Sequence, residues 1–189
     1  MRIGKSQVDD TIKVFGNGPV VIGDRSRIDA GVIICAGEKG VYIGDNVHIA
    51  HNVILAGTSG KIEFSDFSAI GADGKVYTAS EDPFYGLTNP TVPTPYRRPK
   101  VGDVFIGKHV LVYTNVVICP GVTLGEGCAV GAFTVVKDSL LEGVLFAGNK
   151  QIGTRNVDEL RQLEQKYLGM HYYSTNETVA ILEEYMGLP

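Results

Sequence analysis

The chain has 189 residues, 44% of them hydrophobic, which predicts one globular domain with a substantial core. Its net charge of −4 provides no overall basic surface, so we expect no nucleic acid partner and a protein that works on small molecules. No run of 18 apolar residues occurs and the first residues lack an apolar targeting segment, so we expect no membrane insertion and a cytoplasmic location.

A large apolar side chain, aliphatic in fourteen of fifteen cases, recurs at every sixth residue through four blocks of the chain, between residues 22 and 136. Helices repeat near 3.6 residues and strands near 2, so neither element alone explains a period of six. One short strand plus one turn in each hexad does explain it. Three hexads then form one coil of an all-β fold, a parallel β-helix in which each coil covers the next. The repeat positions are Ile22, Ile28, Ile34, Ile43, Ile49, Leu55, Phe64, Ile70, Val76, Ile106, Val112, Ile118, Leu124, Val130 and Val136.

Glycine directly follows the repeat residue in six hexads. The residue four positions after the repeat residue is small or β-branched. We expect these glycines to provide the backbone freedom that a tight corner requires. They are Gly23, Gly44, Gly71, Gly107, Gly125 and Gly131.

The period breaks only after complete sets of three hexads, so each insert is expected to leave the β-helix at the same corner. The third insert, residues 77–103, is much the longest and contains five prolines and three tyrosines. This composition predicts a rigid aromatic loop, unlike a flexible linker. A loop of this length in a compact domain is usually functional.

Residues 156–189 change to helical spacing. Asn156 is expected to cap a helix that Gly169 ends, and a second short helix is expected over residues 177–186. We expect this segment to cap the open end of a β-helix domain formed by residues 1–155, because an open end exposes an unpaired strand edge.

The repeated pattern [LIV]-G-x-x-[STAVC]-x resembles that of the hexapeptide-repeat acyltransferases, over about residues 20–155. The segment ICPGVTLGEGCAVGAFTVVKD, followed by LFAGNKQIG, is similar to the closing segment of the galactoside, maltose and xenobiotic acetyltransferases. The motif Y-T-x-S-x-D with a later LTNPTVP resembles sugar acyltransferases of surface-polysaccharide pathways. The resemblance implies a left-handed β-helix, acetyl-CoA as the donor, a homotrimer and active sites between neighbouring subunits.

The galactoside-type enzymes use a histidine as general base, but the matching run here, LVYTNVVICPGV, has Asn115 in its place. An amide does not accept a proton at neutral pH, so Asn115 or backbone N–H groups are expected to bind the oxyanion. His48, in VHIAHN, is the predicted base because imidazole titrates near neutrality. His51 is a weaker alternative, and a purely structural His48 is the competing interpretation.

Asp82 opens the long insert, where xenobiotic-type enzymes carry a catalytic histidine. We expect it to orient His48 or to hold an ammonium substrate, with a turn cap before a proline as the alternative. No metal is expected. The fold also occurs in γ-type carbonic anhydrases, but His48, His51 and His109 do not have the spacing of that zinc site.

The resemblance places the pantetheine arm of the donor along the last coils, against small residues. Basic side chains nearby are expected to bind the phosphates of CoA, with solvated surface charges as the alternative. The predicted cofactor-binding residues are Gly131, Ala132, Lys137, Gly148, Asn149, Lys150 and Arg155.

The long insert is expected to bind the acceptor. Tyr77 and Tyr85 can pack on a base or sugar ring, and Arg97 with Arg98 can pair with phosphate oxygens. These residues favour N-acetylation of a nucleotide-linked amino sugar, such as a 4-amino-4,6-dideoxyhexose for a surface glycan. O-acetylation of a free sugar or polysaccharide is the alternative, and a non-catalytic trimeric scaffold is an alternative of another class.

Overall fold

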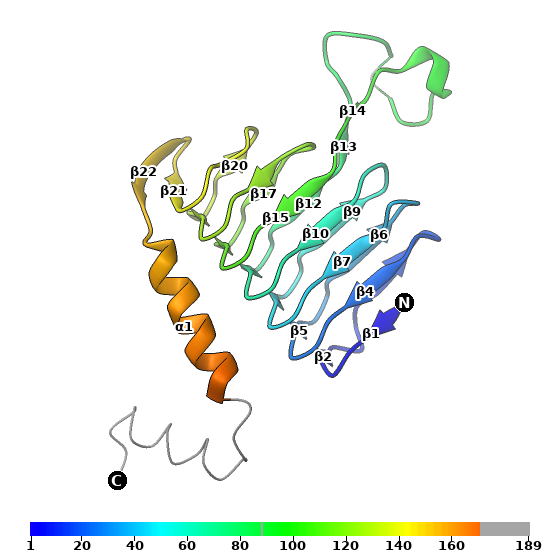
Figure 1. Cartoon of the computed structure of the whole chain (residues 1–189). Coiled ribbons are helices and arrows are strands. Elements are labelled where there is room, and N and C mark those ends of the chain that lie inside the picture. The colour runs from blue at the N-terminus through cyan, green and yellow to red at the C-terminus, as the bar shows by residue number, and fades with distance from the viewer. Residues whose placement is uncertain (88, 171–189) are drawn as a thin grey trace. The chain divides into compact units, whose positions relative to one another are not determined.

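A computed structural model of the chain describes residues 1–87 and 89–170. Short parallel strands wind round one core and form three sheets, which we call sheets A, B and C (Figure 1). Each complete coil contributes one strand to each sheet in that order. Sheet A contains β1 (Arg2–Ile3), β4 (Val20–Ile22), β7 (Val41–Ile43), β10 (Ile62–Phe64), β15 (Val104–Ile106) and β18 (Thr123–Leu124).

Sheets B and C continue the same winding, and sheet B ends in an antiparallel hairpin. Sheet B contains β2 (Gln7–Val8), β5 (Arg27–Ile28), β8 (His48–Ile49), β11 (Ala69–Ile70), β16 (Leu111–Val112), β19 (Ala129–Val130), β21 (Val144–Ala147) and β22 (Lys150–Thr154). Sheet C contains β3 (Lys13–Phe15), β6 (Ile33–Ala36), β9 (Ile54–Gly57), β12 (Lys75–Tyr77), β17 (Val117–Ile118) and β20 (Val135–Val136).

The repeat residues stack in register along the inside of the coils. In sheet A, for example, Ile43 pairs with Ile22 on one side and Phe64 on the other. All fifteen repeat positions are at most 2% exposed. Burying one such side chain stabilises the fold by about 1.5–3 kcal/mol. The predicted parallel β-helix is therefore confirmed. The repeat residues of each coil are buried only because the adjacent coils cover them.

The reason predicted for the glycines after the repeat residues is wrong. None of the six has a positive φ; the left-handed position falls two residues later, at Arg25, Asn46, Asp73, His109 and Phe133 among others. The glycines are needed because the next coil passes too close. A β-carbon at Gly71 would lie 2.7 Å from the backbone nitrogen of Thr114.

The coils begin earlier in the chain than the sequence repeat indicates. β1, β2 and β3 pair with β4, β5 and β6, so that Ile3, Val8 and Val14 align with the first three repeat residues. Ile3 and Val14 are exposed, because this terminal coil has a neighbour on one side only. Its repeat is five residues and then six, which hides it from a search for strict hexads.

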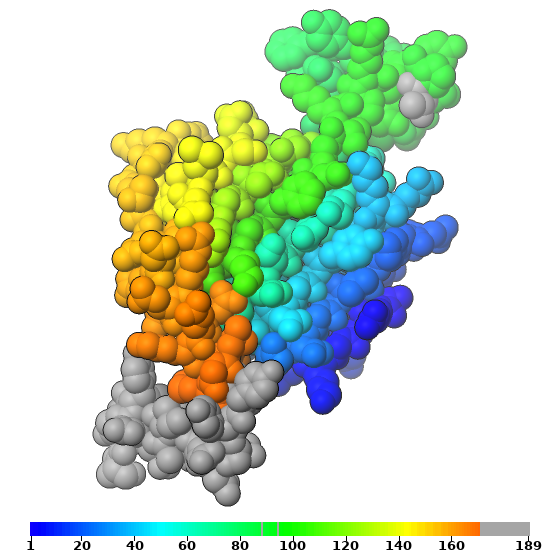
Figure 2. Space-filling view, in the orientation of Figure 1, coloured from blue at the N-terminus to red at the C-terminus, as the bar shows by residue number. Residues whose placement is uncertain are grey.

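The inserts leave at one corner, as predicted, because they follow β6, β9 and β12, which are adjacent in sheet C. The third insert was expected as a loop, but it begins and ends in an antiparallel pair, β13 (Ala79–Ser80) with β14 (Lys100–Val101). A 3-10 helix, η1 (Thr94–Tyr96), lies between them. We call residues 79–101 the arm; Figures 1 and 2 show it standing out from the coils.

The described part of the C-terminal segment is one helix, α1 (Val157–Met170). The predicted cap is confirmed, because the Glu159 N–H donates to Asn156 Oδ1 over 3.2 Å. Gly169 is not the stop, since the helix includes it; a helix near its end tolerates the modest cost of one glycine. The second predicted helix lies outside the described residues. The chain divides into two compact units, Met1–Arg155 and Asn156–Pro189, and the capping role stays a prediction.

Within the described residues, no helix has the length and apolar character needed to cross a membrane.

Candidate active site

The turns between sheets stack into three edges of the β-helix, which we call the AB, BC and CA edges after the sheets they join. Equivalent residues of successive coils lie above one another at about the 4.8 Å spacing of adjacent strands. The edge and the coil of a residue therefore define its place on the surface.

The BC edge places Asn115 beside the small residues predicted for the donor. Asn115 occupies the left-handed position of its turn, with φ of 57°, and its backbone N–H donates to the Ala72 carbonyl over 2.9 Å. Its Nδ2 donates to Thr114 Oγ1 over 3.3 Å, which leaves one amide hydrogen available. Thr114 and Asn115 stand one coil before Ala132 and Phe133, because Phe133 N–H donates to the Thr114 carbonyl over 3.1 Å.

His48 lies on the outer face of β8 and contacts an aspartate of the preceding coil. Its Nε2 is 2.9 Å from Asp29 Oδ2, and its side chain is 43% exposed while that of Asp29 is 17% exposed. Arg27 holds the same carboxylate from its own coil, with Nε 2.6 Å from Oδ1 and a second N–H 3.1 Å from Oδ2. His48 and His51 both lie at the surface, as predicted.

The Arg27–Asp29–His48 group defines which nitrogen of the imidazole is available. The hydrogen bond from Arg27 holds the pKa of the Asp29 carboxyl below its ordinary value, opposed by desolvation and assisted by His48. An ionised carboxylate only accepts hydrogen bonds, so Nε2 carries the proton that Asp29 receives. Neutral His48 therefore has its lone pair on Nδ1, which can accept a proton.

Sequence reasoning did not identify Arg27 and Asp29. A signal for them exists, because Ile28 and Ile49 are repeat residues that pair in the structure. Aligning those two hexads puts Arg27 directly opposite His48, with Asp29 two residues after Arg27 on the same coil.

The predicted donor residues do not all share one edge. Gly131 meets the last coil at the BC edge, where a β-carbon on it would lie 2.7 Å from Ala147 Cβ. The hairpin turn that follows, Gly148 and Asn149, has φ of 56° and 63° and leads to exposed Lys150. Such consecutive positive φ values suit Asn and Gly in a two-residue hairpin.

Lys137 and Arg155 lie on the other two edges. Lys137 follows β20 at the CA edge, beside Cys119, whose thiol pKa is raised by burial against the opposing charge of Lys137. Arg155 lies at the AB edge, where its guanidinium donates to the His109 carbonyl over 3.1 Å. One chain therefore does not bring all the predicted phosphate ligands together.

The arm holds the predicted acceptor residues at the CA edge. Arg97 forms an ion pair with Glu81 and donates to the Pro90 carbonyl over 3.2 Å, so it ties the two ends of the arm together. Arg98 lies over the Tyr85 ring, 5.9 Å from its centre. In the described ranges, no acidic side chain forms an ion pair with Arg98.

Two other predicted residues belong to the arm and its root. Asp82 Oδ1 accepts the Phe84 N–H over 2.9 Å, which is the turn cap expected of an aspartate before proline. Its second oxygen has no recorded partner among the described residues. Tyr77 ends β12, half-buried on the outer face of sheet C.

The histidines considered for zinc do not converge within the chain. His109 stacks on Phe67 at the AB edge, with ring centres 5.4 Å apart, whereas His48 and His51 lie toward the BC edge. Across the two described ranges, no group of three or more His, Cys, Asp or Glu side chains is arranged to hold a metal ion.

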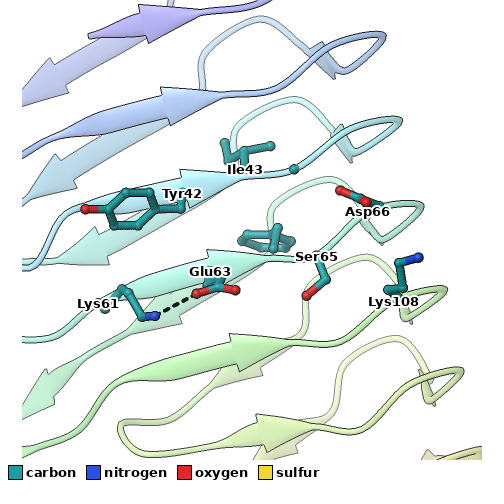
Figure 3. Close-up of a pocket in the computed structure, with 9 residues that line it drawn as sticks. Tyr42, Ile43, Lys61, Glu63, Ser65, Asp66 and Lys108 are labelled. Carbon is teal, nitrogen blue, oxygen red and sulfur yellow. Dashed lines mark hydrogen bonds and ion pairs between the residues drawn. The ribbon is translucent and has the colours of Figure 1, made fainter.

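A recess of about 650 Å³ on the outer face of sheet A contains none of the predicted site residues (Figure 3). Lys61 Nζ lies 2.7 Å from Glu63 Oε2 and 4.6 Å from the centre of the Phe105 ring. The two charges compensate each other, so this pair does not make the recess a site for an anion.

Comparisons with known proteins agree with the repeat. The model of the bacterial transferase hexapeptide (six repeats) matches residues 103–138, and that of the hexapeptide repeat of succinyl-transferase matches residues 14–36 and 19–56. The chain is 36% identical over 135 residues to the dTDP-4-amino-4,6-dideoxy-D-glucose acyltransferase of Escherichia coli, covering 70% of this chain and 69% of that protein.

The fold also matches that of AntD, an N-acyltransferase from Bacillus cereus. AntD in complex with dTDP and 3-hydroxybutyryl-CoA superposes with a TM-score of 0.82 at 33% identity, over 90% of each chain. A variant of AntD in complex with dTDP-4-amino-4,6-dideoxyglucose and coenzyme A has a TM-score of 0.82 at 34% identity, over 89% of this chain and 90% of that one.

Proposed function

The chain belongs to the hexapeptide-repeat acyltransferase family and is an acyl-CoA-dependent acyltransferase; from that premise we propose that it acylates the amino group of a nucleotide-linked amino sugar. The supporting observation is the similarity to AntD along nine-tenths of its length, since AntD was solved with dTDP-4-amino-4,6-dideoxyglucose and coenzyme A. The product would enter a surface glycan. Acetyl-CoA is the proposed donor, and 3-hydroxybutyryl-CoA, with which AntD was solved, is the second candidate.

We assign the proton transfer to His48. The bound sugar ammonium first loses one proton to solvent. The neutral nitrogen then attacks the carbonyl carbon of the thioester, the carbon–sulfur bond breaks and coenzyme A leaves as a thiolate. His48 Nδ1 accepts the proton that the nitrogen loses and then donates it to the sulfur. Asp29 and Arg27 keep the ring in the orientation and tautomer that this step needs.

Two other residues act on the charges of the same reaction in this proposal. Asn115 stands two coils after His48 in the same chain, about 10 Å along the axis, so its amide serves the oxyanion of the tetrahedral intermediate from a neighbouring copy of the chain; backbone N–H groups are the alternative donors. Asp82 holds the substrate ammonium through the oxygen that does not cap its turn. The diphosphate of the acceptor pairs with Arg98. The same role for Arg97 stays a prediction, since it requires Arg97 to leave Glu81.

The placement of these residues supports a homotrimer. His48 and Asn115 lie toward the BC edge, whereas the arm leaves from the CA edge across sheet C. A second copy of the chain can bring its arm to the first copy's BC edge. Sheet C also has half-buried aliphatic side chains on its outer face, Ile33, Ile54 and Val117, in a column that Lys13 and Lys75 share, and a neighbouring copy would cover them.

An assay of thiol release from acetyl-CoA tests the reaction. The panel contains dTDP-linked 4-amino and 3-amino sugars, the matching 4-hydroxy sugar and free sugars, with 3-hydroxybutyryl-CoA as a second donor. We expect turnover of the nucleotide-linked amino sugars. Turnover confined to hydroxyl or free sugars would reject the N-acyl proposal and favour O-acetylation.

Light scattering at micromolar concentration tests the assembly, with a trimer expected. A stable monomer that turns over the amino sugar would remove the shared site from the proposal, because one chain would then be sufficient.

A further inference from the structure

A column of outward side chains on sheet C has large residues at both ends and small residues in the middle. Phe15, Cys35, Ala56 and Tyr77 align across four successive coils at the CA side of the sheet. The two aromatic residues stand at the ends, and the two small residues lie between them. At about 4.8 Å per coil the aromatic residues are roughly 14 Å apart along the axis. The column therefore has a low floor between two aromatic walls.

A cavity of about 830 Å³ opens along the first part of this column. Phe15 and Cys35 line it, together with the turns at residues 16–19, 37–39 and 58–59. Phe15 is 54% exposed, because it lies on the outer face of the terminal coil, which has a neighbour on one side only. We call this cavity and the column beneath it the sheet C trough. Its size lies within the range of small-ligand pockets, about 300–1,000 Å³.

The trough adjoins the root of the arm. Lys39, on its rim, forms an ion pair of 3.0 Å with Asp103, the residue that ends the insert. The Asp103 carboxylate also accepts the Lys61 N–H over 2.9 Å, which fixes the rim to the next coil. Tyr77, at the far end of the column, is the residue from which the insert departs. A ligand in the trough can therefore extend toward the arm.

The chemistry of the lining favours a flat, uncharged ring with polar edges. Phe15 offers an exposed aromatic face, and Cys35 leaves room above the floor. Asn17 and the hydroxyls of Thr58 and Ser59 can exchange hydrogen bonds with carbonyl and N–H groups. Among the described residues that line this cavity, only Glu38 and Lys39 are charged, and their signs are opposite, so the cavity does not suit a diphosphate.

We propose that the sheet C trough binds the pyrimidine base of the nucleotide-linked acceptor, with the base stacked on Phe15 and its diphosphate directed toward Arg98 on the arm. The inference rests on the proposed function, because it takes its ligand class from there. A second copy of the chain is the competing occupant, since the trough lies on the outer face of sheet C that a neighbouring copy would cover.

Calorimetric titration with dTDP, without sugar or turnover, tests the assignment. Cys35→Phe fills the trough and should weaken dTDP binding at least about tenfold, a change of 1.4 kcal/mol, while CoA binding changes less than about twofold. Phe15→Ala removes the stacking face without adding bulk, and should weaken dTDP binding about fivefold. The matched control is Cys119→Phe, which adds the same bulk on sheet C beyond Tyr77 and should leave dTDP binding unchanged.

The outcomes separate this inference from the proposed function. If Cys35→Phe and Phe15→Ala bind dTDP like the wild type, or if the wild type binds no dTDP, the trough is not the base site. If light scattering shows that both variants lose the trimer, the trough is an interface between copies and the inference is overturned. If dTDP binding falls as expected but no nucleotide-linked amino sugar is turned over, the site stands and the proposed reaction fails.

Discussion

The BC and CA edges are built from the same hexads, yet they differ in what they allow. At the BC edge the step from one repeat residue to the next is always six residues, so every turn between the two terminal coils is held by the turns above and below it. At the CA edge the step varies from six, as between Ile118 and Leu124, to thirty, between Val76 and Ile106. The regular edge suits groups that need fixed geometry. The irregular edge can accept inserts of different lengths without disturbing the coils.

The largest effect expected from this difference concerns stability. Leu55→Ala, in the fully buried stack, should lower the free energy of unfolding by about 2–5 kcal/mol, because it leaves a cavity that the coils do not collapse into. Leu87→Ala, on the arm and 58% exposed, should change it by less than about 0.5 kcal/mol. Urea unfolding followed by circular dichroism measures both. Equal losses would mean that the arm is integral to the core.

The next effect concerns the imidazole toward the BC edge. His48→Asn should lower kcat about 100-fold or more, because asparagine does not accept the proton, with the Kd for CoA unchanged. His51→Asn, one turn along the same coil, is the matched control and should stay within about threefold of the wild type. Steady-state kinetics across pH 6 to 8 measure both. Near-normal kcat in His48→Asn would return this residue to a structural role.

A smaller effect is expected from the cation of the arm. Arg98→Ala should raise KM for the nucleotide sugar about tenfold, the size of one lost charge-assisted hydrogen bond, and leave KM for acyl-CoA unchanged. Lys100→Ala removes a positive charge from the stem of the same arm and should have little effect. Similar changes in both variants would point to general electrostatic attraction, and no change in either would move the phosphate away from the arm.

The smallest effect concerns acid stability. Arg27 and His48 hold the folded-state pKa of Asp29 below its ordinary value, so this group stabilises the fold above that ordinary value and stops doing so as pH falls through the lowered one. Asp29→Asn should therefore lower Tm most near neutral pH, and the difference from the wild type should shrink in acid. Thermal unfolding from pH 7 down to pH 2 measures it. A constant difference would indicate lost packing instead of lost charge.

The architecture followed from the sequence because a period of six has one economical solution. Ile22 to Val136 indicated the buried stack, and the breaks after complete sets of three hexads indicated a single corner for inserts. Asn156 was recognised as a cap because capping depends on residues three apart. These features depend on neighbours in the chain or on the repeat itself.

Part of the candidate site was also predictable. Asn115, Gly131 and Ala132 share the BC edge because the hexad register already aligns them. Lys137 and Arg155 were grouped with them through the donor site that the family resemblance implies, and the structure separates them, since each strand turns the chain toward another edge.

The sequence by itself determined the coils, their buried residues and the position of the arm, because each depends on periodicity. Only the tertiary structure decided that Asp29 joins His48 to Arg27, that Arg97 is occupied by Glu81, and that Phe15 and Tyr77 frame a trough. These contacts join residues on different coils or on the two ends of an insert. Their geometry depends on how coils stack and side chains turn, which no period in the sequence specifies.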